Sequence, residues 1–251
     1  MAITSLFING TLPVIPGMKK LSDFEMPDIF EGLPLPAVNW RAGYFFGPKN
    51  PQMAANLLFP EHSGEAFNSP VRSDFGATFN AQSYIDTAIK LPAYVSVAGV
   101  IRRPPVSTET TFILTDFTGT AAAGNGLAVA VRSSGKLALY HQNGEAAPLL
   151  TEVDFPASVK VGDKAGFTVS VKDKVLIIAM YDPETETLNV KNAATTYARM
   201  ESVRSALIGA KYSNNTATSV EVRALLVAEG DIGVTSGQAD HITLLKYLLS
   251  L

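Results

Sequence analysis

The segment "DPETET" at residues 182–187 gathers three carboxylates beside a predicted turn. Asp182, Glu184 and Glu186 stand at alternate positions, so an extended backbone points them to the same side. Calcium prefers several hard oxygen ligands, which carboxylates supply. The segment is therefore a candidate Ca²⁺ site, and we expect no other cofactor. The alternative is a solvated hairpin tip whose acidic side chains oppose aggregation.

Aromatic and amide side chains near two predicted hairpins indicate a different chemistry, sugar binding. Exposed aromatic rings stack on sugar rings, and amide groups hydrogen-bond to hydroxyl groups. The candidate glycan-binding residues are Tyr140, His141, Asn143, Tyr212 and Asn214. The alternative is that they are ordinary turn residues.

The sequence contains none of the common catalytic motifs. His62, His141 and His241 lie far apart, and none belongs to an H-E-x-x-H pattern. G-x-S-x-G and P-loop patterns are also missing. The chain has no cysteine, which excludes a disulfide scaffold, a thiolate metal site and a cysteine nucleophile. We therefore expect a protein that is not an enzyme, with His241 exposed near the start of a terminal helix.

Composition and charge exclude several classes of partner. The chain has 251 residues, of which 47% are hydrophobic and 17% charged, enough to bury a sizeable core. The net charge is −3 and no run of Lys or Arg occurs, so nucleic-acid binding is not expected. No apolar run approaches the roughly 20 residues of a membrane span, so membrane insertion is not expected. The start, "MAITSLFINGTLPVIPG", lacks the pattern of a signal peptide, which predicts a soluble protein made without Sec-type export.

Apolar and polar residues alternate from residue 71 onward, which is typical of half-buried strands. No helix-length pattern separates these segments, so the sequence predicts an all-β, antiparallel β-sandwich. The segment "KVLIIAMYD" is apolar on both faces and is predicted to be a central strand. The predicted strands span residues 94–102, 111–115, 126–132, 136–142, 166–172, 174–182, 188–190, 205–212 and 220–228.

The last segment instead predicts a short C-terminal helix. Thr235 and Gln238 fit a capping box at its start. Ile242, Leu245 and Leu249 share one face, with Leu244 and Leu248 beside them. Because so short a helix is marginal alone, we expect it to pack on the sandwich.

Residues 1–70 differ from the rest, because they contain nine of the 15 prolines and many aromatic residues. Proline removes a donor from a β-ladder, so this composition predicts an extended N-terminal arm ahead of a sandwich domain at residues 71–251. An irregular aromatic segment needs a surface to lie on, either a neighbouring subunit or the protein's own core. The candidate assembly interface in "PLPAVNWRAGYFFGP" consists of Trp40, Arg41, Tyr44, Phe45 and Phe46.

The order of these segments over residues 75–251 resembles a concanavalin A-like, laminin-G-type jelly roll. The resemblance includes "GLAVAVRSSGKLALY", "AGFTVSVKDKVLIIAMYD" and an I-G strand before the last strand and helix. A tryptophan that the family usually has near the position of Phe167 is missing here. The matching positions include Gly126, Leu127, Gly135, Leu137, Tyr140, Tyr181, Asp182, Ile208 and Gly209.

The resemblance implies further expectations about chemistry. Laminin-G-type modules often hold Ca²⁺ at the rim of the sandwich, so the resemblance also favours a Ca²⁺ site at the acidic segment 182–187. The fold also includes glucanases, whose retaining members carry E-x-D-x-(x)-E on one strand. Here "EVDFPAS" supplies Glu152 and Asp154 without a third carboxylate, and Pro156 interrupts the strand. The acid pair needed for glycoside hydrolysis is therefore missing.

A proline-rich leader before such a sandwich, without cysteines, resembles virion proteins of tailed bacteriophages. We therefore expect a non-enzymatic virion structural protein of the tail, collar, fibre or head decoration, assembled in the host cytoplasm. Its arm would dock to other virion proteins or to sister copies in a homo-oligomer, leaving the sandwich exposed. The alternative is a lectin-like receptor-binding module that recognises a host surface glycan.

Overall fold

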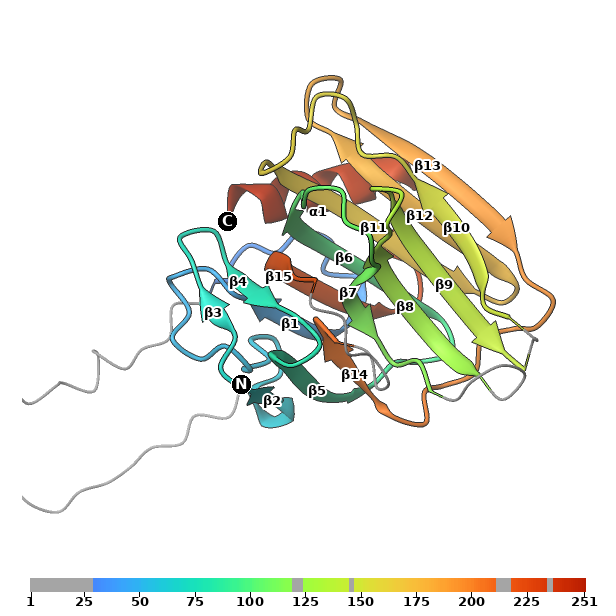
Figure 1. Ribbon diagram of the computed structural model, residues 1–251, viewed down its shortest axis with the longest axis horizontal. Helices are drawn as coiled ribbons and strands as arrows, with labels where there is room; N and C mark the ends of the chain where they lie inside the picture. Colours follow the sequence, from blue (N-terminus) through green and yellow to red (C-terminus); the bar gives the residue numbers. More distant parts are fainter. Residues whose placement is uncertain (1–28, 119–123, 145–146, 211–217, 234–236) are drawn as a thin grey trace, which may run out of the picture.

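A computed structural model describes residues 29–118, 124–144, 147–210, 218–233 and 237–251. Two antiparallel sheets face each other, and one C-terminal helix lies against the larger sheet (Figure 1). The predicted all-β sandwich with a short terminal helix is therefore confirmed. Within the described ranges, no helix has the length and apolar character needed to cross a membrane.

The larger sheet has the order β13-β12-β11-β6-β15-β4-β3. The long strand β15 pairs with β6 along one edge, and with β4 and then β1 along the other. The strands of this sheet are β1 (Asn39–Phe45), β3 (Val71–Arg72), β4 (Ala77–Phe79), β6 (Val95–Arg102), β11 (Lys164–Lys172), β12 (Val175–Asp182), β13 (Thr187–Ala194) and β15 (Val220–Glu229).

The smaller sheet has the order β10-β9-β8-β7-β14-β5-β2. Its hairpin between β8 and β9 turns at the "SSG" segment, as the glycine pattern indicates. The strands are β2 (Glu65–Phe67), β5 (Tyr84–Lys90), β7 (Thr111–Thr115), β8 (Asn125–Val131), β9 (Leu137–Asn143), β10 (Leu149–Val153) and β14 (Ser205–Ile208), and a short 3₁₀ helix, η2, spans Pro60–His62.

The hydrophobic core has two parts, one on each face of the larger sheet. The main part fills the space between the sheets, where inward-pointing Val, Leu, Ile and Phe side chains are fully buried. The second part lies between the outer face of the larger sheet and the terminal helix. Strands β1, β6 and β15 contribute to both parts, so they bury apolar side chains on both faces. The prediction for residues 174–182 is confirmed in part: β12 pairs with a strand on each side, but it lies next to the edge strand and exposes Val175 and Ile177.

The terminal helix α1 (Gln238–Ser250) packs against β11 and β6. Its buried ridge consists of Leu244, Leu245 and Leu248, while Ile242 and Leu249 are only half-buried. The predicted helix is confirmed, but its apolar face is rotated from the predicted one. Gly237 occupies the N-cap position without a side-chain cap, and Thr235 lies outside the described residues.

Residues 29–70 do not form a separate arm, so the predicted boundary at residue 70 is wrong for them. Strand β1 pairs with β15 along its whole length, and the next residue, Phe46, continues the pairing through its backbone N–H to the carbonyl of Arg223 at 2.7 Å. The physical reason is that Pro36 and Pro48 flank this stretch without interrupting it, so its backbone donors can join the ladder. Residues 1–28 of the predicted arm lie outside the described residues.

Candidate ligand-binding cavity

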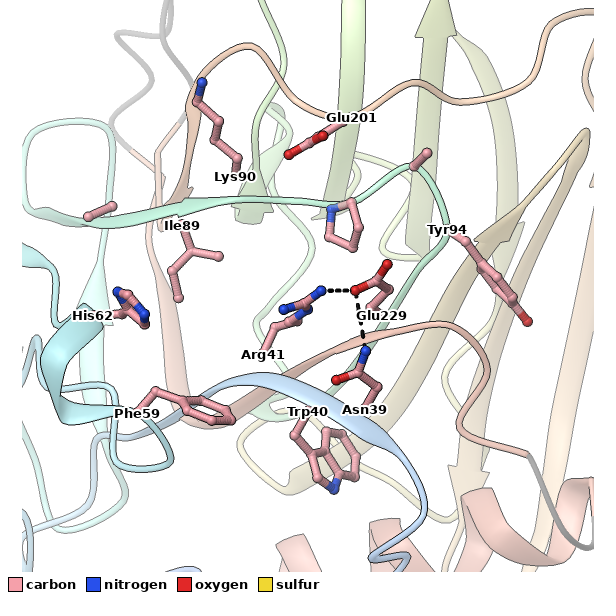
Figure 2. A pocket seen from close by; sticks show the side chains of 13 residues that line it. Asn39, Trp40, Arg41, Phe59, His62, Ile89, Lys90, Tyr94, Glu201 and Glu229 are labelled. Atoms are coloured by element: carbon pink, nitrogen blue, oxygen red, sulfur yellow. Dashed lines mark hydrogen bonds and ion pairs between the residues drawn. The ribbon is translucent and has the colours of Figure 1, made fainter. Parts of the chain in front are cut away.

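A cavity of about 820 Å³ opens between the start of β1 and the end of β5 (Figure 2). Five segments that are distant in the sequence line it. They are residues 39–41 of β1, Phe59 with His62 of η2, residues 88–90 and 92–94 from β5 into the following loop, Glu201 between β13 and β14, and Glu229 at the end of β15. The two sheets bring these segments together at one end of the sandwich.

An ion pair between Arg41 and Glu229 lies at the centre of the lining (Figure 2). Asn39 Nδ2 donates a hydrogen bond to Oε2 of the same carboxylate at 3.3 Å. The register of β1 explains the arrangement, because Trp40 pairs with Ala228 and Ala42 with Val227, leaving Arg41 as the extra residue of a β-bulge. Bulges redirect a side chain in this way, and here the guanidinium turns toward the end of β15.

Apolar surface stands beside this polar group. Phe59, Ile89 and Pro92 are half-buried and contribute to the walls. Figure 2 shows Phe59 and Ile89 on one side of the ion pair and Tyr94 on the other, whereas Trp40 points away from Arg41. The cavity is therefore lined by both hydrogen-bonding groups and apolar side chains.

The charged groups of the cavity balance one another. Arg41 and Lys90 carry positive charges, and Glu201 and Glu229 carry negative charges, so the formal sum is zero with His62 neutral. Burial, together with the carboxylate of Asp231, raises the pKa of Tyr94 to about 12. Tyr94 is therefore a neutral phenol at the cavity edge over the whole physiological pH range.

The predicted glycan-binding residues of β9 lie away from this cavity. His141 is fully buried, so the prediction that it contacts a surface ligand is wrong. Asn143 donates to the backbone carbonyl of Ala198 at 2.7 Å. Tyr140 is half-buried beside a small cavity of about 130 Å³, and burial raises the pKa of its hydroxyl group. Tyr212 and Asn214 lie outside the described residues.

Two of the three predicted calcium ligands, Asp182 and Glu186, have protein partners of their own. Asp182 accepts hydrogen bonds from Ser158 Oγ at 2.7 Å and from the Glu184 N–H at 3.0 Å, and these bonds lower its pKa. Glu186 forms an ion pair with Lys246 of α1 at 2.7 Å. Within the described ranges, no three His, Asp or Glu side chains lie close enough together to hold a metal ion. The arrangement fits a solvent-exposed turn tied to the helix.

The carboxylates that match the glucanase pattern only partly are also paired. Glu152 of β10 forms an ion pair with Arg132, and Asp154 forms one with Lys136 at 3.2 Å. Each carboxylate therefore faces a cation from the β8–β9 hairpin.

The predicted assembly residues divide into two groups. Tyr44, Phe45 and Phe46 are at most 1% exposed and belong to the protein's own core, so the prediction that they contact a partner is wrong. Trp40 is half-buried and Arg41 is exposed, and both line the cavity. The other residues that line the cavity were not among the predicted site residues. The one local indication in the sequence is that polar Asn39 and Arg41 stand inside an aromatic segment. Nothing in the sequence connects these two residues to Glu229.

His241 is not exposed as predicted, but half-buried against the larger sheet. Its Nδ1 lies 3.1 Å from the hydroxyl of Thr168 on β11, and its Nε2 lies 3.8 Å from Asp231. Burial lowers the pKa of His241, while the carboxylates of Asp231 and Asp240 oppose that shift. The residue ties the first turn of α1 to the sheet.

Comparisons with known proteins identify the fold. No family model and no curated protein matches the chain. Similar solved structures include the receptor binding domain of botulinum neurotoxin C/D mosaic serotype, with a TM-score of 0.57, 9% identity, and coverage of 82% of this chain and 51% of that one. A structure of botulinum neurotoxin type C, whose cell entry is described as dependent on two ganglioside molecules, has a TM-score of 0.57, 8% identity, and coverage of 83% and 51%.

A mutant of Trypanosoma rangeli sialidase displaying trans-sialidase activity is also similar, with a TM-score of 0.55, 8% identity, and coverage of 84% of this chain and 33% of that one. The chain thus spans about half the length of the botulinum chains and a third of the sialidase chain. At these identities the likeness concerns the fold alone. The chain has the lectin-like, jelly-roll β-sandwich fold.

Proposed function

We propose that this protein is a non-catalytic, lectin-like binding module that holds a glycan in the cavity between β1 and β5. The observation that carries the proposal is the cavity itself, in which Arg41, Glu229 and Asn39 stand beside apolar walls. Its volume of about 820 Å³ lies in the usual range for small-molecule sites. Support also comes from structural neighbours described as a receptor binding domain and as dependent on gangliosides.

The lining matches the two surfaces of a sugar. Hydroxyl groups both donate and accept hydrogen bonds, and here Arg41 and Asn39 supply donors while Glu229 supplies an acceptor. The C–H faces of a sugar ring are apolar and pack on aromatic and aliphatic side chains. Phe59, Ile89 and Pro92 offer such surface beside the polar group.

The proposal that the module is non-catalytic follows from the carboxylates near possible sugar sites. Glycoside hydrolysis needs one carboxyl group as acid and a second as base or nucleophile. Of the two carboxylates in the cavity, Glu201 and Glu229, Glu229 is engaged by Arg41 and Asn39, which leaves one carboxylate where hydrolysis needs two; outside the cavity, Glu152 is engaged by Arg132. We expect no release of reducing sugar from any glycan that binds.

A glycan array followed by titration calorimetry tests the binding site. We expect Arg41→Ala and Phe59→Ala each to weaken the binding of the best glycan by about ten-fold or more. Tyr140→Ala is the control, because Tyr140 lies on β9 beside a different, smaller cavity. Loss of binding in Tyr140→Ala with normal binding in Arg41→Ala would place the site on β9 and contradict the proposal.

A second candidate function is the virion structural role that the sequence resemblance implies. One structural observation favours a protein contact: the loop between β13 and β14 exposes Tyr197, Met200 and Val203 by 51%, 53% and 68%. These side chains replace the buried aromatic residues of β1 as candidates for contact with other virion proteins or sister copies. Mass spectrometry of purified phage particles tests the role, and absence of the protein from the particles would contradict it.

A further inference from the structure

We infer that the cavity selects neutral glycans with adjacent hydroxyl groups and excludes glycans that carry a carboxylate there. This inference rests on the proposed function and concerns the class of ligand at the same site. It differs from what the descriptions of the structural neighbours suggest, because one of those neighbours is a sialidase and another is described as interacting with gangliosides.

The ion pair presents a donor and an acceptor to the same ligand. The side chains of Arg41 and Glu229 are 50% and 39% exposed, so both remain accessible from the cavity. Their mutual contact uses Nη2 of Arg41 and Oε2 of Glu229, and Asn39 donates to that same oxygen. The other guanidinium N–H groups and the second carboxylate oxygen then suit two neighbouring hydroxyl groups, one accepting and one donating.

The charge balance opposes an acidic sugar. Recognition of a carboxylate depends on a cation whose charge is free to face it, as in bidentate arginine pairs. Here Glu229 already neutralises Arg41. The other cation, Lys90, shares the rim with Glu201 (Figure 2). A ligand carboxylate placed at Arg41 would therefore lose solvation and lie next to Glu229, and like charges at a binding site disfavour a partner strongly.

The apolar walls complete the selection. Phe59, Ile89 and Pro92 favour a ligand that offers a C–H face next to its hydroxyl pair. A neutral pyranose has both surfaces, whereas a carboxylate on the same edge would face Glu229. The geometry therefore excludes the charged group at the position where the hydroxyl pair binds.

The test compares matched pairs of oligosaccharides that differ in one terminal acidic sugar. Titration calorimetry of the full chain should show about ten-fold or tighter binding of the neutral member. In Glu229→Gln the guanidinium of Arg41 is no longer neutralised, so we expect weaker binding of the neutral member and stronger binding of the acidic one. The preference should therefore reverse.

Two further variants serve as controls. Glu152→Gln makes the same change in net charge at another arginine–glutamate pair outside the cavity, and it should leave the preference unchanged. Arg41→Gln should weaken the neutral ligand without any gain for the acidic one. Both pairs are partly exposed, so these variants are expected to fold, which circular dichroism checks.

The outcomes separate the inference from the proposed function. Tighter binding of the acidic member by the unchanged protein would overturn the inference and leave the proposed function standing. An unchanged preference in Glu229→Gln, with the variant folded, would also overturn the inference. Binding of neither member, nor of any other glycan, would overturn the proposed function and the inference together.

Discussion

Arg199 and Asp116 form an ion pair in which neither side chain has any exposed surface. Ser202 donates to the same carboxylate, and the Leu127 N–H donates to its other oxygen at 2.6 Å. Arg199 also donates to the backbone carbonyl of Pro92 at 3.1 Å. These contacts hold the loop that carries Tyr197, Met200 and Glu201 against the smaller sheet, so a buried charge positions a surface loop.

The buried pair predicts a large loss of stability when one partner is removed. In Arg199→Met the carboxylate of Asp116 stays buried without a cation, which costs about 3–5 kcal/mol of unfolding free energy. Urea unfolding followed by circular dichroism measures the loss. Lys136→Met is the control, because its pair with Asp154 is exposed and contributes about 0–1 kcal/mol. Equal midpoints for the two variants would contradict the prediction.

Gly209 directly follows β14 in a backbone conformation that favours glycine. Its φ is +88°, and a Cβ atom there would lie 2.1 Å from the Cβ of the buried Phe79. A side chain would therefore meet both backbone strain and a clash with the core.

Alanine substitution separates these two effects. Gly162 also has a positive φ, +92°, but a Cβ there would find nothing within 4 Å. We expect Gly162→Ala to cost about 1–2 kcal/mol from backbone strain. Gly209→Ala should cost about 1–3 kcal/mol more from overpacking. Thermal unfolding by calorimetry measures both, and a smaller effect at Gly209 would show that Phe79 moves aside freely.

At the scale of the element, the docking of helix α1 is expected to depend on pH through His241. Burial lowers the pKa of His241 in the folded protein below its ordinary value of 6.5. The unfolded chain therefore binds more protons just below pH 6.5, so stability is full above this value and falls as the pH drops toward the folded pKa. His241→Gln should flatten this part of a stability–pH curve. A curve that keeps its slope in the variant would assign the dependence to other groups.

The strands were predictable because period-2 alternation records which residues face the core. The predicted strand at residues 111–115 has the same bounds as β7. The predicted strands at 166–172 and 220–228 fall within β11 and β15. Position within the sheet was not predictable, because "KVLIIAMYD" is apolar on both faces although β12 neighbours the edge strand. The outer face of the larger sheet is buried where α1 covers it and where Phe30 and Leu58 cover β1, and the sequence does not give these positions.

For the whole molecule, the inclusion of β1 in the larger sheet changes what a truncation can test. A chain lacking residues 1–60 loses β1 together with Tyr44, Phe45 and Phe46, which fill the core. The loss of several buried aromatic side chains costs more free energy than the usual unfolding free energy of a domain. We therefore expect that chain not to fold. A chain lacking residues 1–28 keeps every described strand and should unfold cooperatively. Cooperative unfolding of the chain that lacks residues 1–60 would contradict the prediction.

The cavity could not be predicted, since it exists only when five segments meet. Glu229 and Arg41 are separated by most of the chain, and their contact depends on the β1–β15 register and on the bulge at Arg41. The clusters that stand together in the sequence, Tyr140–His141 and Asp182–Glu186, instead belong to a buried strand and to a turn.

Trp40 is the chain's only tryptophan, and it lies on β1 next to Arg41 in the cavity lining. Its indole points away from Arg41 and packs against the second part of the core, on the outer face of the larger sheet. The emission of the natural protein therefore reports on that packing without any attached dye. Loosening of the outer face should expose the indole to solvent and shift the emission to longer wavelength.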